Sequence, residues 1–152
     1  MNRRPNPLQR EVVGNENMPD RPPKRILFVC VENSNRSQMA EAFARIHGGA
    51  GVEAYSAGSR PSGRINPKAV AAMKEVDYDL TTHRSKGLDD FNGKPFDAAV
   101  TMGCGDECPL VRAARRVDWQ IPDPREMPPE RFREVRDLIE SKVVSLLREL
   151  GD

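Results

Sequence analysis

The stretch from Cys30 to Ser37 constrains this chain more than any other. It reads Cys-Val-Glu-Asn-Ser-Asn-Arg-Ser and lies between an apolar run, Arg25 to Val31, and a helical pattern that begins near Arg36. The apolar run is typical of a strand that is buried on both faces of a parallel sheet. A Cys-x5-Arg pair at such a strand-to-helix junction can surround a tetrahedral oxyanion with backbone N–H groups that point inward. The stretch therefore predicts an oxyanion site that presents a cysteine sulfur.

Alternating strand and helix patterns along the chain predict an α/β fold. The first helix ends before Gly48, and a second begins at the Asn66-Pro67 pair, which is typical of a helix cap. Further strands are expected at 52–56, 97–102 and 116–120, and helices at 66–76 and from 128 to about 150, the latter with Phe132, Val135, Leu138, Ile139, Val143, Leu146, Leu147 and Leu150 on one face. These elements predict a three-layer α/β/α sandwich around a four-stranded parallel sheet. Loops after parallel strands meet at one sheet edge, so we expect Cys30, Cys104, Cys108 and Asp123 to be neighbours.

Length and composition predict one catalytic domain behind a disordered N-terminal extension. Residues 1–24 combine arginine, asparagine and proline with few apolar side chains, so they cannot bury enough surface to offset the entropy cost of ordering. Residues 25–152 are long enough to form one core. The 24 basic and 23 acidic residues give no overall argument for nucleic acid or a membrane as partner. No run of membrane-spanning length and no secretory signal is visible, so we expect a cytoplasmic protein that acts as a monomer.

Cys30 has the setting of a nucleophile. The thiolate is the reactive form of cysteine, and a helix N-terminus stabilises it. Arg36 offers a planar fork to two oxygens of an anion, and Ser37 can donate a hydrogen bond to the sulfur. The expected oxyanion-binding residues are Val31, Glu32, Asn33, Ser34, Asn35 and Arg36.

The twelve residues from Cys30 to Glu41 resemble the signature of arsenate reductases built on the low-molecular-weight tyrosine phosphatase fold. Other segments resemble that family in the same order: Tyr55-Ser56-Ala57-Gly58, Asn66-Pro67-Lys68-Ala69, Val100-Thr101-Met102 and Asp123-Pro124. The resemblance covers residues 25 to 150 and implies reduction of arsenate to arsenite. It implies that Cys30 attacks the oxyanion, that Arg36 binds it, and that Asp123 is the general acid for the leaving oxygen.

A reductase also needs further thiols to release arsenite, and Cys104 and Cys108 are the candidates. Their spacing of four residues allows a disulfide if the segment coils into a turn, and the order in which they act stays open. Three cysteines in a chain without an export signal argue against a disulfide framework. The resemblance implies an external reductant, either thioredoxin or glutaredoxin with a small thiol, and no bound cofactor.

Two other functions remain open. A phosphatase acting on phosphotyrosine or a small phosphoester would use the same loop through a cysteinyl-phosphate, although phosphatases of this fold typically carry tyrosine where Arg125 follows Asp123-Pro124 here. A non-enzymatic oxyanion or redox sensor would use the loop for binding alone.

The sequence also offers two candidate ion sites. A zinc site from Cys104, Cys108, His47 and His83 is a weak pattern, and we expect no metal. Some relatives bind potassium beside the loop at positions that match Asn33, Glu41 and Ser56. The position of their acidic ligand is Lys86 here, and we expect that its ammonium group could replace the cation.

Overall fold

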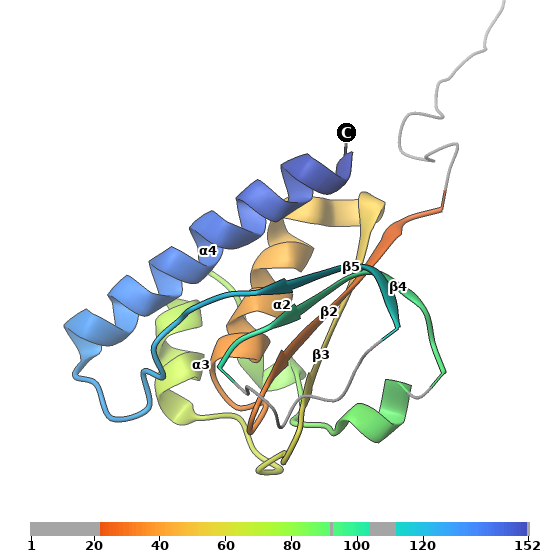
Figure 1. The fold of residues 1–152 in the computed structure, drawn as a ribbon. Coiled ribbons are helices and arrows are strands. Elements are labelled where there is room, and N and C mark those ends of the chain that lie inside the picture. Colours follow the sequence, from red (N-terminus) through yellow and green to blue (C-terminus); the bar gives the residue numbers. More distant parts are fainter. Residues whose placement is uncertain (1–21, 92, 104–111, 152) are drawn as a thin grey trace, which may run out of the picture.

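A four-stranded parallel sheet organises residues 22–91, 93–103 and 112–151, which are the residues that the computed structural model describes. The first strand of the sheet in chain order, β2 (Lys24–Cys30), lies between β3 (Val52–Gly58) and β4 (Phe96–Thr101), and β5 (Ala113–Asp118) pairs with the far side of β4 (Figure 1). All three pairings are parallel. The predicted four-stranded parallel sheet is confirmed.

Helices cover both faces of the sheet. Successive side chains of a strand point to opposite faces. Ile26 and Phe28 join the core formed with α2 (Arg36–Gly48) and α4 (Pro129–Gly151), whereas Leu27 and Val29 join a smaller cluster on the other face. That second cluster is covered by side chains of the short 3-10 helix η3 (Leu88–Phe91). The three-layer α/β/α arrangement is therefore confirmed, with η3 as the described helix on the second face.

Shorter helices connect these layers. The 3-10 helix η1 (Gly49–Gly51) links α2 to β3, and α3 (Pro67–Lys74) and the 3-10 helix η2 (Leu80–Thr82) lie between β3 and β4 in the chain. As the sequence predicts, the Asn66 side chain caps α3 by accepting a hydrogen bond from the backbone N–H of Lys68 at 2.9 Å. The proline at the first helical position supplies a φ angle that already suits a helix.

Some boundaries and exposures differ from the sequence prediction. The sequence predicts the fourth strand at 116–120, but β5 is Ala113–Asp118. It begins earlier because Ala113 already pairs with Phe96, the first residue of β4. Ile46 and Leu138, which fit the apolar stripes of α2 and α4, are exposed at 44% and 39%. Apolar spacing therefore gives the direction of each helix face but not its width.

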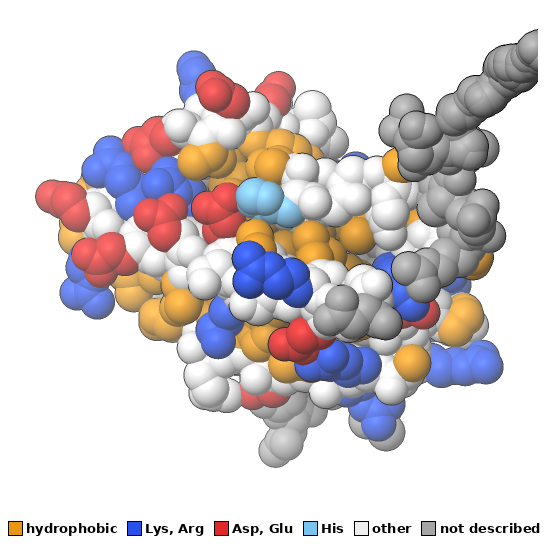
Figure 2. Space-filling view, turned by 90° about the horizontal axis from the view of Figure 1, so that it is seen from above, with side chains coloured by type: hydrophobic (Ala, Val, Ile, Leu, Met, Phe, Trp, Pro, Cys, Tyr) orange, Lys and Arg blue, Asp and Glu red, His pale blue; other side chains and the backbone are white. Residues whose placement is uncertain are grey.

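Charged side chains of both signs lie on the surface. Figure 2 shows acidic and basic side chains interspersed across one face, with apolar patches between them. Among the described residues, no helix is long and apolar enough to cross a bilayer. Of the predicted N-terminal extension, 1–24, only residues 22–24 belong to the described part, and Cys104 and Cys108 also lie outside it.

Candidate active site

The loop that follows β2 turns its carbonyl groups away from the site. The carbonyls of Cys30, Val31 and Glu32 accept hydrogen bonds from backbone N–H groups of the 59–62 segment at 2.8–3.1 Å. The Ser34 carbonyl accepts one from the N–H of Asn66 at 3.2 Å. The carbonyl of Asn33 accepts one from the Gln38 side chain at 3.0 Å. Five successive carbonyls are thus occupied on the outer side of the loop.

These outward carbonyls determine where the loop N–H groups point. In a planar trans peptide, the N–H of one residue is antiparallel to the carbonyl of the residue before it. Five N–H groups therefore point the opposite way, and they belong to Val31, Glu32, Asn33, Ser34 and Asn35. Asn33 has a φ angle of 53°, which is the left-handed region that a tight loop requires. Of the predicted oxyanion-binding residues, Val31, Glu32, Ser34, Asn35 and Arg36 line the cavity described below, whereas Asn33 is fully buried and is not part of its lining.

Cys30 lies at the base of this loop, where Ser37 contacts its sulfur. Cys30 is 3% exposed, and its Sγ is 2.9 Å from Ser37 Oγ. Ser37 Oγ also accepts a hydrogen bond from Asn33 Nδ2 at 2.8 Å. Because Asn33 uses a lone pair of this hydroxyl, its hydrogen is available to the sulfur. Such a bond stabilises the thiolate over the neutral thiol.

Arg36 is held against the opposite side of the site. Its side chain is 10% exposed, and Nη1 donates to the carbonyl of Ile121 at 3.0 Å. A β-carbon added to Gly103, whose φ angle is +80°, would lie only 2.5 Å from Nη1. Glycine at this position therefore leaves the space that the guanidinium occupies.

Asp123 stands at the rim of the same cavity. The cavity has a volume of about 330 Å³ and is lined by Cys30, Val31, Glu32, Ser34, Asn35, Arg36, Gly103, Asp123 and Arg125. Asp123 Oδ2 lies 3.9 Å from Arg36 Nη2, beyond hydrogen-bond distance, and half of the Asp123 side chain is exposed. Its Oδ1 accepts a hydrogen bond from the N–H of Arg125 at 3.0 Å, so Oδ2 is the oxygen that can exchange a proton with an oxygen inside the cavity. The structure brings Cys30 and Asp123 together as predicted.

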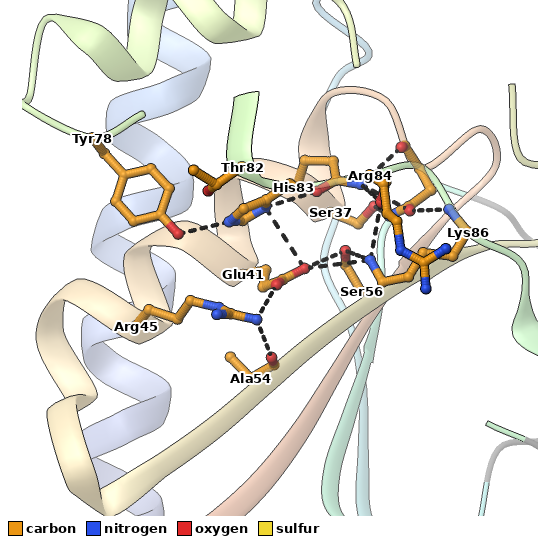
Figure 3. A network of polar contacts seen from close by, with 12 residues as sticks. Ser37, Glu41, Arg45, Ala54, Ser56, Tyr78, Thr82, His83, Arg84 and Lys86 are labelled. Atoms are coloured by element: carbon orange, nitrogen blue, oxygen red, sulfur yellow. Dashed lines mark hydrogen bonds and ion pairs between the residues drawn. The ribbon is translucent and has the colours of Figure 1, made fainter. Parts of the chain in front are cut away.

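A buried polar chain supports the loop from behind (Figure 3). Gln38 Nε2 donates to the side-chain and main-chain oxygens of Asn33, at 2.8 and 3.0 Å, and to the Arg84 carbonyl at 3.0 Å. Its Oε1 therefore accepts from His83 Nδ1 at 2.9 Å, which leaves His83 Nε2 to accept from the Tyr78 hydroxyl at 2.6 Å. Burial lowers the pKa of His83, although the nearby Glu41 carboxylate opposes the shift. Burial and these contacts thus favour the neutral ring of His83.

Glu41 and Lys86 form a charged cluster beside this chain. The Glu41 carboxylate accepts hydrogen bonds from Ser56 Oγ at 2.6 Å and from Arg45 Nη2 at 2.5 Å. Lys86 Nζ lies 3.1 Å from the Arg84 carbonyl, 3.4 Å from Ser56 Oγ and 3.8 Å from Glu41 Oε1. Burial lowers the pKa of Lys86, and Glu41 opposes this. The ammonium group is therefore surrounded by oxygen atoms that also suit a metal cation, and its replacement of potassium stays a prediction.

Several supporting residues were not assigned by sequence reasoning. The sequence assigns no role to Gln38 or Tyr78 and offers His83 only as a zinc ligand, whereas all three support the loop. In the sequence Gln38 falls on the polar side of the predicted helix, so no sequence signal marked it as a buried support. Nothing in the sequence pattern placed Gly103 against Arg36.

The zinc and relay predictions depend partly on residues outside the described part of the chain. His47 bonds to Glu140 at 2.7 Å, and His83 is engaged as above. The described residues contain no group of three or more histidine, cysteine, aspartate or glutamate side chains that could hold a metal. Cys104 follows the cavity residue Gly103 directly in the sequence.

The fold and the loop are those of cysteine-dependent oxyanion enzymes, and comparison with known proteins identifies the family. Residues 25–152 match the family model described as "Low molecular weight phosphotyrosine protein phosphatase". The chain belongs to this family.

Curated relatives and solved structures that are similar to this chain carry the name arsenate reductase. The chain is 35% identical over 131 residues to the "Glutaredoxin arsenate reductase" of Synechocystis sp., covering 84% of this chain and 99% of the relative. A solved structure described as "An arsenate reductase in the phosphate binding state" has a TM-score of 0.77 and 36% identity, covering 83% of this chain and 98% of its own. The thioredoxin-dependent arsenate reductase of Corynebacterium glutamicum has a TM-score of 0.72 and 31% identity, covering 86% and 63%.

Proposed function

We propose that this chain reduces arsenate to arsenite through Cys30. The observation that carries the proposal is the loop beside Cys30, whose residues Val31, Glu32, Ser34 and Asn35 line the cavity with their carbonyls turned away from it, together with the Arg36 guanidinium. Such donors fit the several negative oxygens of a tetrahedral anion. The relatives named as arsenate reductases favour arsenate as that anion.

The first step joins sulfur to arsenic. The Cys30 thiolate attacks arsenic, a sulfur–arsenic bond forms, and one arsenic–oxygen bond breaks. Asp123 gives its proton to the departing oxygen, which leaves as water. Arg36 and the loop N–H groups hold the remaining oxygens, and Ser37 supports the attacking thiolate.

The second step transfers two electrons to arsenic. A thiolate from Cys104 or Cys108 attacks the sulfur of Cys30, so that a disulfide forms while the sulfur–arsenic bond breaks. The electron pair of that bond stays on arsenic, which leaves as arsenite. The remaining cysteine can then attack the sulfur that is bonded to Cys30, so that a Cys104–Cys108 disulfide forms and the Cys30 thiolate is released. An external thiol reductant, either thioredoxin or glutaredoxin with a small thiol, reduces the remaining disulfide and restores all three thiols.

The reductant, compartment and domain organisation complete the proposal. Glutaredoxin with a small thiol and thioredoxin are both supported by relatives that carry those names. Either reductant would act in the cytoplasm, where thiols stay reduced. The catalytic domain is residues 25–152, which the family match supports, with residues 1–24 as an extension. We further propose that the protein acts as a monomer.

Single cysteine variants test the proposal. The purified full-length protein receives arsenate with thioredoxin, and separately with glutaredoxin and a small thiol, while p-nitrophenyl phosphate is assayed in parallel. Replacing Cys30 by serine should abolish both activities, because both need the nucleophile. Replacing Cys104 or Cys108 by serine should abolish arsenate reduction alone. If both of these variants reduce arsenate at the wild-type rate, the relay is wrong, and phosphatase turnover without arsenate reduction would establish the competing function.

A further inference from the structure

Two oppositely charged side chains meet across the mouth of the oxyanion cavity. Glu32 belongs to the loop that follows Cys30, and Arg125 comes two residues after Asp123 on the facing wall. Arg125 Nη1 donates to Glu32 Oε2 at 3.0 Å. The two side chains are 52% and 43% exposed, so the contact lies at the rim of the cavity rather than in its base.

The backbones that carry this ion pair are fixed on both sides. The N–H of Arg125 donates to Asp123 Oδ1 at 3.0 Å, and Lys68 Nζ donates to the Arg125 carbonyl at 2.9 Å. On the other wall, the Glu32 carbonyl accepts hydrogen bonds from the N–H of Ser62 and from the Ser85 hydroxyl, both at 3.0 Å. The two side chains therefore meet because their walls are held in place.

The position of the pair bears on which anions can enter. In the proposed reaction, the oxygen that leaves arsenic faces Asp123, so in an ester this oxygen would carry the organic group. That group would have to leave the cavity between the wall of Asp123 and the loop of Glu32. The hydrogen bond between Arg125 and Glu32 spans this gap and leaves no space between the bonded atoms for an aromatic ring.

The charges of the pair act on all anions alike. A free Glu32 carboxylate at the rim would repel an incoming dianion, and Arg125 neutralises it. Removing either partner should thus change the affinity for every anion, but in opposite directions.

We propose that the Glu32–Arg125 ion pair is a specificity-determining clasp that admits bare tetrahedral oxyanions and disfavours esters with an aromatic group. The inference rests on the proposed function, because it assigns a substrate class to the same cavity. An exposed ion pair contributes up to about 1 kcal/mol, so opening the clasp should cost an aromatic ester about fivefold in affinity.

Protection of Cys30 from alkylation measures this selectivity without turnover. The reduced full-length protein is treated with iodoacetamide, and modification of Cys30 is followed by mass spectrometry at increasing concentrations of inorganic phosphate or benzylphosphonate, which cannot be hydrolysed. The wild type, Arg125→Ala and Glu32→Ala are compared. Arg115→Ala is the matched control, because Arg115 forms an exposed ion pair with Glu149 outside the cavity lining.

The clasp predicts one pattern for the selectivity and another for the affinity. The ratio of the two protection constants, which favours phosphate in the wild type, should fall about fivefold in both Arg125→Ala and Glu32→Ala and stay unchanged in Arg115→Ala. Phosphate protection itself should weaken in Arg125→Ala and strengthen in Glu32→Ala. Glu32→Gln, which keeps the side-chain length, should give a smaller change in the same direction than Glu32→Ala.

Failure of the clasp and failure of the proposed function give different results. A ratio that stays at the wild-type value in both variants would overturn the clasp, even in a protein that reduces arsenate. A ratio that falls equally in Arg115→Ala would also overturn it, because the effect would then belong to surface charge in general. If the wild type fails to reduce arsenate, the proposed function is wrong. The protection ratio would still test the clasp, because its measurement needs no turnover.

Discussion

Gly103 lies where any side chain would collide with the anion-binding guanidinium. In Gly103→Ala, the new β-carbon would come within 2.5 Å of Arg36 Nη1. A non-glycine residue at a φ angle of +80° also costs about 1–2 kcal/mol. The displaced guanidinium would lose its hydrogen bond to Ile121, and its contact with a bound anion is worth about 1.5–3 kcal/mol. Phosphate affinity should therefore fall about ten- to hundredfold.

Gly63→Ala separates the effect on the site from backbone strain. Gly63 has a φ angle of +87°, and an added β-carbon there meets nothing within 4 Å. Both variants should thus lose similar stability to backbone strain, but only Gly103→Ala should lose phosphate binding.

Urea unfolding with and without phosphate measures both quantities. A phosphate concentration one hundred times the wild-type Kd should stabilise the wild type and Gly63→Ala by about 2.7 kcal/mol. If the Kd of Gly103→Ala is about a hundredfold weaker, the same phosphate should stabilise that variant by only about 0.4 kcal/mol. Equal stabilisation of Gly103→Ala and Gly63→Ala by phosphate would refute the placement of Arg36 against Gly103.

Three further predictions concern the support of the loop. Burial holds the pKa of His83 below its ordinary value of 6.5. As the pH falls below 6.5, the unfolded chain therefore binds a proton at His83 before the folded protein does, and the free energy of unfolding decreases. Urea titrations at about pH 7.5 and about pH 5.5 should show a smaller fall in His83→Gln than in the wild type, with His47→Gln as control, and an equal fall would contradict the account. Potassium should raise the urea midpoint of Lys86→Asp but not that of the wild type, because the variant replaces the ammonium group beside Glu41 and Ser56 by a carboxylate. No potassium effect in the variant would exclude the ammonium replacement. Ser37→Ala should slow alkylation of Cys30 at neutral pH by tenfold or more, because a hydrogen bond to the thiolate is worth about 1.5–3 kcal/mol, and an unchanged rate would remove Ser37 from the mechanism.

The sheet and its main helices could be predicted because each leaves a local signal. The continuous apolar run before Cys30 identifies a strand buried on both faces, and the Asn66-Pro67 pair marks the start of α3. The loop could be identified because its function depends on residues that are consecutive in the chain. These features need no knowledge of long-range contacts.

The support of the site could not be predicted, because it is made by contacts between distant segments. Gln38 and Glu41 read as polar positions of an amphipathic helix, yet both are buried, since Arg84, His83 and Lys86 return to them from more than forty residues away. Periodicity gives the phase of a helix and not the identity of the segment packed on its polar side. The Glu32–Arg125 pair, 93 positions apart, was unpredictable for the same reason.

The stoichiometry of a single turnover tests the central claim most directly. Fully reduced protein is mixed with excess arsenate in the absence of any external reductant, and arsenite and free thiols are counted. Transfer of two electrons from a pair of cysteines predicts one arsenite and the loss of two thiols for each protein molecule, with Cys30→Ser giving neither. Protein that keeps all three thiols and forms no arsenite, while it still binds phosphate, would contradict the account.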